Sequence, residues 1–422
     1  MSFVLRTIVC LLCVFPPLLR AEQCLVFGDS LTKEYEFEFP LLFRNNPASW
    51  QARNWIEILH QHRTDWFDTG PWGSYSIGDP RIAGHRHNWA FPGATTGDIR
   101  NQLTSFYSAL WRGTLENQLR NDVERVVIFA GGNDADSYYA NLYNGLVGPE
   151  VTNTTLANLQ WLVNYVRTVN ASLPIVLVSV PHVGCTPQVQ QGYPTDPVKT
   201  ARVTAAMDAL NASLAAWAQS QGIGFVPEVY EFTKAIITQP FRIRGIEFYR
   251  VADADSRVRY VFSGDGFHPG TCAHTKIAQW VVNAFQARYP GTPMNRLDDR
   301  YIVTQVLGLD PAIPFTEWMA AQGITGGFAD DFDRDGTANG LEFALDQPVL
   351  PLPVMENGTL TMTWRPRDVF AEWGLLKVQS GPDLGSWFDV PVDQTTANPD
   401  GSLTVRLTTP GHRFLRLHAT GG

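Results

Sequence analysis

The residues whose types suit acyl-transfer chemistry lie in four short segments of the chain. Such chemistry needs a nucleophile, a base to take its proton, an acid to orient that base, and hydrogen-bond donors for an oxyanion. A serine hydroxyl, an imidazole, carboxylates and small amide-bearing loops are all present, so together they predict a nucleophilic site. The segments are GDS at 28–30, NWAFPGAT at 88–95, AGGND at 130–134 and DGFHP at 265–269.

Five residues take named roles in this prediction. Ser30 is the nucleophile, His268 is the base, and Asp265 orients the imidazole. The backbone N–H groups of Ser30 and Gly93 and the side-chain amide of Asn133 are the oxyanion donors.

The alternative is that these residues only shape turns. Serine, asparagine and aspartate cap helices and organise loops without taking part in any reaction. We expect this structural role for Asp29 and Asp134, whose carboxylates neighbour the proposed nucleophile and the proposed amide donor.

The elements that would position the segments alternate along the chain. Apolar runs rich in β-branched and aromatic residues predict strands buried on both faces, at 24–28, 125–132 and 173–181. Amphipathic or alanine-rich stretches predict helices at 52–62, 155–170, 200–222 and 270–291. This alternation predicts a parallel sheet, whose ligand site lies in the loops at the carboxyl ends of the strands.

The chain resembles the GDSL or SGNH family of serine hydrolases. The resemblance covers about residues 24–290 and rests on FGDSLT, NWAFPGATT, AGGND and DGFHP in the family's order, and VSVPHVGCTP at 178–187 resembles the family's stretch following its fourth strand. It implies a three-layer α/β/α, flavodoxin-like domain with Ser30 as nucleophile and His268 as base. It also implies Gly93 and Asn133 as oxyanion donors and Asp265 as the orienting acid. Pro92 departs from the family pattern, in which a second glycine is frequent.

A second motif lies in the acidic segment DFDRDGTANGLE at 331–342. Oxygen-bearing residues stand at positions 1, 3, 5, 7, 9 and 12, with Gly336 at position 6, which is the spacing of an EF-hand calcium loop. The segment resembles the dockerin-type loop of bacterial extracellular modules, so we expect a structural Ca²⁺ there and no cofactor for catalysis. The alternative is a solvated acidic turn. The expected ligands are Asp331, Asp333, Asp335, Thr337 through its carbonyl, Asn339 and Glu342.

The cysteines and the remaining histidines lead to weaker expectations. Cys185 and Cys272 are the candidates for a disulfide near the site, with two free buried thiols as the alternative. We expect His85 and His87 to be solvated, because no third metal ligand lies nearby in sequence. His274 is expected to point outward from the last helix of the α/β domain.

Segment composition divides the chain into four parts. Residues 1–21 have the basic start and short apolar run of an export signal, and no later segment is apolar enough to span a membrane. We expect the hydrolase domain at 22–292, a linker helix and calcium loop at 293–348, and a small, mainly β module at 349–422. The protein is therefore expected to be secreted or periplasmic, with attachment to the cell surface as an option.

The overall charge limits the partners. The formal net charge of −9 disfavours nucleic acid, whose phosphates require a basic face. The expected function is hydrolysis of a carboxylic ester of a lipid, an aryl alcohol or an O-acetylated glycan. A catalytically silent surface or binding protein and an acyltransferase are the alternatives, and the oligomeric state stays open.

Overall fold

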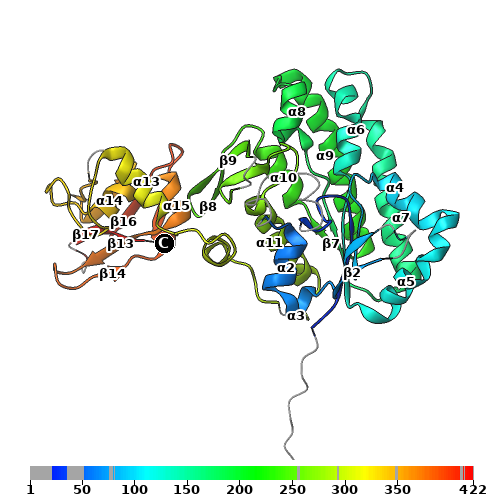
Figure 1. Cartoon of the computed structure of the whole chain (residues 1–422). Coiled ribbons are helices and arrows are strands. Elements are labelled where there is room, and N and C mark those ends of the chain that lie inside the picture. Colours follow the sequence, from blue (N-terminus) through cyan, green and yellow to red (C-terminus); the bar gives the residue numbers. More distant parts are fainter. Residues whose placement is uncertain are drawn as a thin grey trace, which may run out of the picture.

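The computed structural model describes residues 21–35, 52–75, 79, 81–253, 257–291, 294–346, 350–408, 412 and 414–421. Figure 1 shows a larger lobe built around a parallel sheet and a smaller lobe formed by the C-terminal residues. The predicted export signal lies almost wholly outside the described residues. The proposed domain boundaries after 292 and 348 also fall among residues that are not described.

The larger lobe contains a five-stranded parallel sheet in the order β4-β1-β5-β6-β7. This confirms the α/β architecture predicted from the alternating apolar runs. Because β1 lies between β4 and β5, the loops after these three strands meet at one edge of the sheet. The strands are β1 (Cys24–Gly28), β4 (Asn88–Ala90), β5 (Arg125–Phe129), β6 (Ile175–Val178) and β7 (Gly224–Val226).

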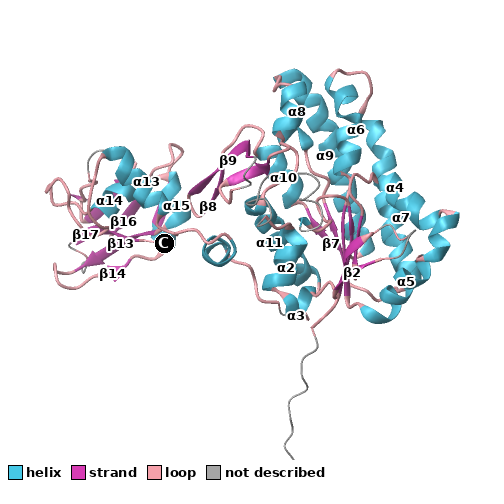
Figure 2. Ribbon diagram, in the orientation of Figure 1, coloured by secondary structure: helices cyan, strands magenta, loops and turns pink. Residues whose placement is uncertain are grey.

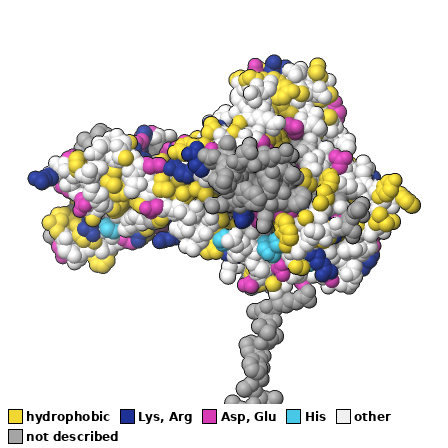
Figure 3. Space-filling model, viewed as in Figure 1, with side chains coloured by type: hydrophobic (Ala, Val, Ile, Leu, Met, Phe, Trp, Pro, Cys, Tyr) yellow, Lys and Arg dark blue, Asp and Glu magenta, His cyan; other side chains and the backbone are white. Residues whose placement is uncertain are grey.

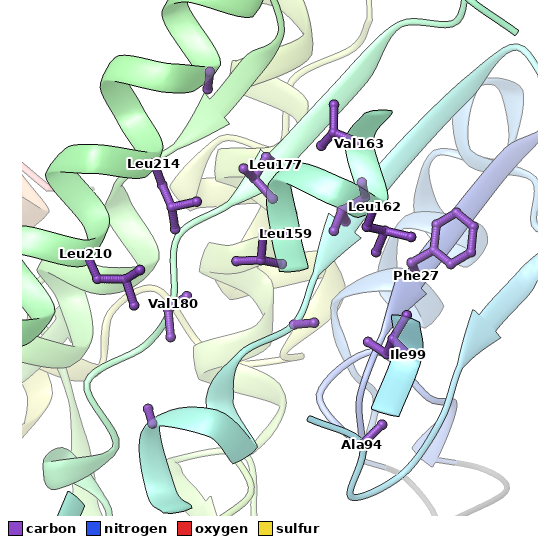
Figure 4. Close-up of a cluster of buried hydrophobic side chains, with 14 of the residues drawn as sticks. Phe27, Ala94, Ile99, Leu159, Leu162, Val163, Leu177, Val180, Leu210 and Leu214 are labelled. Carbon is purple, nitrogen blue, oxygen red and sulfur yellow. The ribbon is translucent and has the colours of Figure 1, made fainter. Parts of the chain in front are cut away.

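Alternate residues of these strands enter two separate cores. Leu25 and Phe27 of β1 pack into one core, whereas Cys24 and Val26 pack into the other. Successive side chains of a strand point to opposite faces, so an all-apolar strand requires a helical layer on each side. Figure 2 shows helices on both faces of the sheet, and Figure 4 shows part of the first core, with Phe27 near Ile99 of one flanking helix.

The first helical layer packs into the core that contains Leu25 and Phe27. The long helix of this layer, α9, is capped by Asp196 and ends at Gly222, which adopts the left-handed conformation that favours glycine. The layer consists of α4 (Thr96–Thr104), α5 (Arg112–Asn117), α6 (Gly132–Tyr143), α7 (Asn153–Val169) and α9 (Pro197–Gln221).

The second helical layer packs into the core that contains Cys24 and Val26. A capping box formed by Asn54 and Glu57 begins its first helix. The layer consists of α2 (Trp55–His62), α10 (Glu228–Ala235) and α11 (Thr271–Arg288), and α3 (Thr64–Phe67) and α8 (Pro187–Gly192) are short additions to the lobe. These three layers, α/β/α, are the architecture expected from the sequence.

Two small groups of strands lie outside the central parallel sheet. The strands β2 (Trp72–Ser74) and β3 (Ala83–His85) pair antiparallel ahead of β4. The second group is a hairpin excursion formed by β8 (Phe241–Ile243) and β9 (Ile246–Asp253), which pair antiparallel, with β10 (Tyr260–Ser263) beside β9.

The smaller lobe contains two antiparallel sheets, in the orders β11-β12-β16-β15 and β14-β13-β17. The short helix α12 (Asp299–Tyr301) precedes it, and α13 (Ile313–Gln322), α14 (Asn339–Ala344) and α15 (Asp368–Trp373) pack within it. Its strands are β11 (Val354–Glu356), β12 (Thr359–Trp364), β13 (Leu375–Gly381), β14 (Phe388–Asp389), β15 (Thr395–Ala397), β16 (Leu403–Leu407) and β17 (Phe414–Thr420).

The β8–β9 hairpin joins the two lobes. Arg244 donates a hydrogen bond to the carbonyl of Trp373 at 3.0 Å, and the Gly245 N–H donates to Glu372 at 3.1 Å. Arg259, between β9 and β10, pairs with Glu317 of α13. The C-terminal lobe therefore contacts the excursion that leads through β10 to the segment containing His268.

The surface agrees with the charge expected from composition. On the face shown in Figure 3, dark-blue basic side chains lie beside magenta acidic ones rather than in one basic patch. Among the described helices, none combines the length and the hydrophobicity that crossing a membrane would require.

Candidate active site

Ser30 lies directly beyond the carboxyl end of β1, in a tight turn that begins at Asp29. The Asp29 carbonyl accepts hydrogen bonds from Thr32 N–H and Lys33 N–H, and its Oδ1 accepts from Leu31 N–H at 2.9 Å. Gly28 permits this turn, because a Cβ there would lie 2.5 Å from the Phe129 carbonyl oxygen.

The Asp29 carboxylate is buried beneath this turn. Burial raises the pKa of Asp29 to about 6, although the Leu31 N–H and the nearby imidazole of His268 act in the opposite direction. Its bonding within the turn matches the structural role expected from the sequence.

Asp265 and His268 lie together in the loop between β10 and α11. The Nδ1 atom of His268 forms a hydrogen bond with Asp265 Oδ2. Asp265 Oδ1 accepts bonds from the Phe267 and His268 N–H groups and from the Ser263 hydroxyl. Although burial raises the pKa of Asp265, the hydrogen bond and charge of His268 together hold it at about 2, so the carboxylate is ionised when it orients the imidazole.

The two oxyanion-donor loops are hydrogen-bonded to each other. Asn133, in the first turn of α6, donates from its amide to the Ala94 carbonyl at 3.1 Å. Asp134 accepts from the N–H and the hydroxyl of Thr96 at 2.7 and 2.6 Å, at the start of α4. These bonds fix Gly93 and Asn133 relative to each other, and they give Asp134 the structural role expected for it.

The Ser30 and Gly93 N–H groups are available as donors. Gly93 has a φ of 72°, a backbone conformation that residues with side chains rarely adopt, and this conformation sets the direction of its N–H. Within the described residues, neither group donates a hydrogen bond to another protein atom.

The separate loops converge on one hollow. Ser30 and Asn133 line it together with Phe267 and Pro269, the two neighbours of His268 in sequence. The effect of His268 on the pKa of Asp29 also requires the β1 and His268 loops to be close. The structure thus brings the predicted site residues to one edge of the sheet, from positions up to 238 residues apart in the chain.

Comparison with known proteins gives one decisive result. A model described as the GDSL-like Lipase/Acylhydrolase family matches residues 26–276, which is more than half of the chain. The chain belongs to this family. No curated protein matches the sequence.

Several solved structures resemble this GDSL-like chain at a distance. Phospholipase A1 from Streptomyces albidoflavus is 14% identical, with 63% of this chain and 99% of that chain covered and a TM-score of 0.35. An extracellular lipase from Streptomyces rimosus is 16% identical, covering 63% and 100% at 0.31. A carbohydrate esterase family 3 structure from Talaromyces cellulolyticus is 12% identical, covering 64% and 100% at 0.33.

Tyr35 and His274 support the His268 loop, and sequence reasoning missed this arrangement. The Tyr35 hydroxyl lies 3.0 Å from the Pro269 carbonyl and 2.8 Å from His274 Nε2. The prediction that His274 points outward is wrong: it is fully buried, and burial lowers its pKa to about 3. The neutral imidazole can donate from Nε2 to Tyr35, which then donates to Pro269. In sequence, the one available signal is the placement of His274 four residues after a predicted helix start.

The expectation that His85 and His87 are solvated is also wrong. His87 is 3% exposed, and burial lowers its pKa to about 4. His85 is half-buried in β3, where its Nδ1 lies 2.6 Å from the Gly70 carbonyl and its ring packs against His60. His85 thus belongs to the β2–β3 pair and packs against His60 of α2, whereas His87 lies between β3 and β4 and is buried.

The predicted pairing of Cys185 with Cys272 is not formed. The thiols of Cys24, Cys185 and Cys272 are all free and buried in the structure. The Cys272 thiol instead donates to the Tyr260 carbonyl at 3.3 Å, and Cys185 lines the hollow beside Ser30. Burial raises the pKa of all three thiols, and that of Cys185 reaches about 12, so they remain protonated and unreactive near neutrality.

The acidic loop brings part of its predicted ligand set together. One carboxylate oxygen from each of Asp331, Asp333 and Asp335 lies within 4.8 Å of the others. The Gly336 N–H donates to Asp331, and Gly336 itself has a φ of 94°. Burial, followed by the charges of these three aspartates, raises the pKa of Glu342, which therefore lies close to them.

Asn339 does not fit the role expected at the ninth position. Its Oδ1 accepts a hydrogen bond from Phe332 N–H at 3.1 Å, and its amide donates to the Gly327 carbonyl at 3.1 Å. The fully buried side chain instead holds the start of the loop to its end. Thr337 is buried, and its N–H donates to Asp335 at 2.7 Å.

Proposed function

We propose that the chain is an exported serine hydrolase that cleaves carboxylic esters. The observation that carries the proposal is the hydrogen-bonded pair of Asp265 and His268 at the edge of the sheet where Ser30 follows β1. Family membership supports ester hydrolysis in general, whereas the individual residue roles are inferred from the geometry. The export part rests on the sequence of residues 1–21 alone.

In the first half of the reaction, Ser30 Oγ attacks the ester carbonyl while His268 Nε2 takes its proton. The ionised Asp265 stabilises the resulting imidazolium through Nδ1. His268 then gives the proton to the departing alcohol, which leaves an acyl group on Ser30. A water molecule, deprotonated by the same imidazole, releases the acid and restores the serine.

The oxyanion formed in each half-reaction needs donors that are already in place. The N–H groups of Ser30 and Gly93 supply two, and the second amide hydrogen of Asn133 supplies a third, since its first is held by Ala94. Because the Asn133–Ala94 and Asp134–Thr96 bonds exist before substrate binds, this arrangement requires little reorganisation during reaction.

Turnover of p-nitrophenyl acetate by the wild type and by Ser30→Ala tests the proposal. Loss of the nucleophile should lower kcat by about 10³-fold or more. Equal rates would rule out the serine mechanism, and no turnover by the wild type on any ester tested would favour a silent binding protein. An acyltransferase would instead transfer the acyl group to an added alcohol in preference to water, which product analysis distinguishes.

We further propose a structural calcium ion in the acidic loop. Its ligands would be carboxylate oxygens of Asp331, Asp333, Asp335 and Glu342, with the Thr337 carbonyl; Asn339 is left out because its side chain is held by the backbone. Asp331 Oδ1 is buried and has no hydrogen-bond partner among the described residues, as expected of an atom reserved for a cation. Four neighbouring carboxylates repel one another, and a divalent cation removes that repulsion.

A further inference from the structure

The hollow beside Ser30 continues into the second core of the larger lobe. It has a volume of about 630 Å³, including its open mouth. Ser30 and Asn133 line it, and much of the rest of its wall consists of buried apolar side chains that belong to the core between the sheet, α10 and α11. The hollow is therefore a gap in the packing that starts at the reacting atoms.

Two helices present regular apolar faces to this gap. Val229, Phe232 and Ile236 recur at helical spacing along α10 and the residue after it, so one face of that helix forms one wall. Ala273 and Ile277, four residues apart on α11, also line the hollow. Such apolar walls favour a ligand that is itself apolar.

Beside Ser30, the hollow is also lined by Asp29, whose Oδ2 is buried and has no hydrogen-bond partner among the described residues. Farther from Ser30 in the chain, the other polar side chains of the wall are hydrogen-bonded within the protein. The Thr233 hydroxyl donates to carbonyls of its own helix, and the Thr186 hydroxyl donates to the Val183 carbonyl at 2.8 Å. His182 contacts Thr204 and Gly184 through its two ring nitrogens, and burial lowers its pKa to about 4. A sugar placed here would lose its hydrogen bonds to water without replacement.

A second hollow, which Gly93 and its neighbours line, is different. It lies on the surface, between the Phe91–Ala94 loop and the face of α4 that carries Asp98, Asn101 and Gln102. An ester bound at Ser30 has an acyl side and an alcohol side. The apolar hollow beside Ser30 suits the acyl side, and the open, polar-edged one suits an alcohol that must exchange with water.

We propose that the apolar hollow beside Ser30 is the acyl-chain pocket and that the enzyme hydrolyses esters of fatty acids rather than acetylated sugars. This rests on the proposed function, because it uses Ser30 as the point of attachment. Each methylene that leaves water on entering the pocket should raise kcat/KM about fourfold, up to the length that the pocket accepts. Ala273 limits that length from the α11 side.

The experiment compares p-nitrophenyl acetate, butyrate, hexanoate and octanoate with the wild type and with Ala273→Leu. The wild type should prefer octanoate to acetate. The leucine adds three carbons inside the pocket, so the octanoate-to-acetate ratio of kcat/KM should fall about 50-fold. Ala287→Leu, the same change at an exposed position of α11, should leave the ratio unaltered. Ile277→Ala lengthens the pocket and should shift the preference to decanoate.

Three results would overturn the pocket assignment: a wild-type ratio near one, an equal effect of Ala273→Leu on all esters, or length dependence only when the alcohol of alkyl acetates is varied. Each leaves Ser30-dependent hydrolysis intact, so it is distinct from failure of the proposed function. A binding measurement adds a readout without turnover. Ser30→Ala should bind octanoate by calorimetry, and Ser30→Ala combined with Ala273→Leu should bind it at least tenfold more weakly.

Discussion

The two lobes differ in how far apart in sequence their candidate functional residues lie. In the larger lobe, the candidate catalytic residues come from loops separated by up to 238 positions, and a continuous core brings them together. In the smaller lobe, the acidic residues lie within one twelve-residue loop whose geometry depends on its own backbone bonds. The larger site should therefore be sensitive to packing and burial anywhere in its lobe, and the acidic loop mainly to its own charges.

The largest effect separating the two lobes should come from Asp265→Asn. An amide at this position cannot stabilise the His268 imidazolium, so kcat for ester hydrolysis should fall about 10³- to 10⁴-fold. Hydrogen exchange of peptides covering 331–346, measured by mass spectrometry, should remain unchanged. A loss of activity smaller than tenfold would contradict the role of Asp265.

Packing around the Ser30 turn supplies the next contrast. A Cβ at Gly28 meets the Phe129 carbonyl oxygen and Thr32, neither of which can move without disturbing the sheet, so Gly28→Ala should lower the free energy of unfolding by about 3 kcal/mol. Gly401→Ala, in a turn of the smaller lobe, has open space around its Cβ and only a positive φ of 83°, so about 1 kcal/mol is expected. Equal losses in denaturant titrations of the two variants would refute this difference.

Acid should weaken the larger lobe selectively. Burial lowers the pKa values of His87, His182 and His274 to about 4, 4 and 3, from about 6.5 when unfolded. The unfolded chain therefore binds more protons, so stability present above pH 6.5 is lost progressively as the pH falls toward 4. Denaturant titrations at pH 7.5, 6 and 5 should show this loss of stability. His274→Gln removes one of the titrating groups, so it should reduce the slope of the unfolding free energy against pH by about the contribution of one proton. A stability independent of pH over this range would contradict the buried, neutral histidines.

Calcium should act on the smaller lobe. Removing Ca²⁺ with a chelator leaves the carboxylates of the loop to repel one another, so melting of this lobe should shift downward by several degrees. Exchange in peptides 331–346 should increase, while p-nitrophenyl acetate turnover changes less than twofold. Glu342→Gln should lessen the response to the chelator. Identical melting with and without chelator would count against the calcium site.

The smallest effect should come from Tyr35→Phe, which tests the support of the His268 loop. Removing the hydroxyl breaks its bond to Pro269 and leaves His274 Nε2 without this partner. One such bond is worth about 1 kcal/mol, so kcat should fall roughly fivefold with KM little changed. If Tyr35 were only packing material, the pH profile of kcat would keep its shape. A positioning role predicts that the acidic limb, which reports the imidazole, shifts.

Much of the fold was readable from local pattern alone. Apart from Arg125, the runs at 24–28 and 125–132 contain only apolar residues and glycine. Both faces of each predicted strand are therefore apolar, and a strand of this kind must be buried on both sides. The acidic loop was equally local, because alternate oxygens and a glycine at position 6 specify a turn without reference to the rest of the chain. The catalytic candidates were different: no spacing rule relates Ser30 to His268, and their association came from motifs in a family's order.

Only the tertiary structure decided the features that depend on what lies across a packed interface. The helical pattern at 270–291 could not show that His274 faces Tyr35, nor could loop placement show that Cys185 and Cys272 stay unpaired. The spacing of the acidic loop did not reveal that Asn339 bonds to the backbone. The apolar gap beside Ser30 likewise exists because α10 and α11 meet the sheet at particular distances. Sequence determines which face of an element is apolar, whereas partners and voids follow from how distant elements pack.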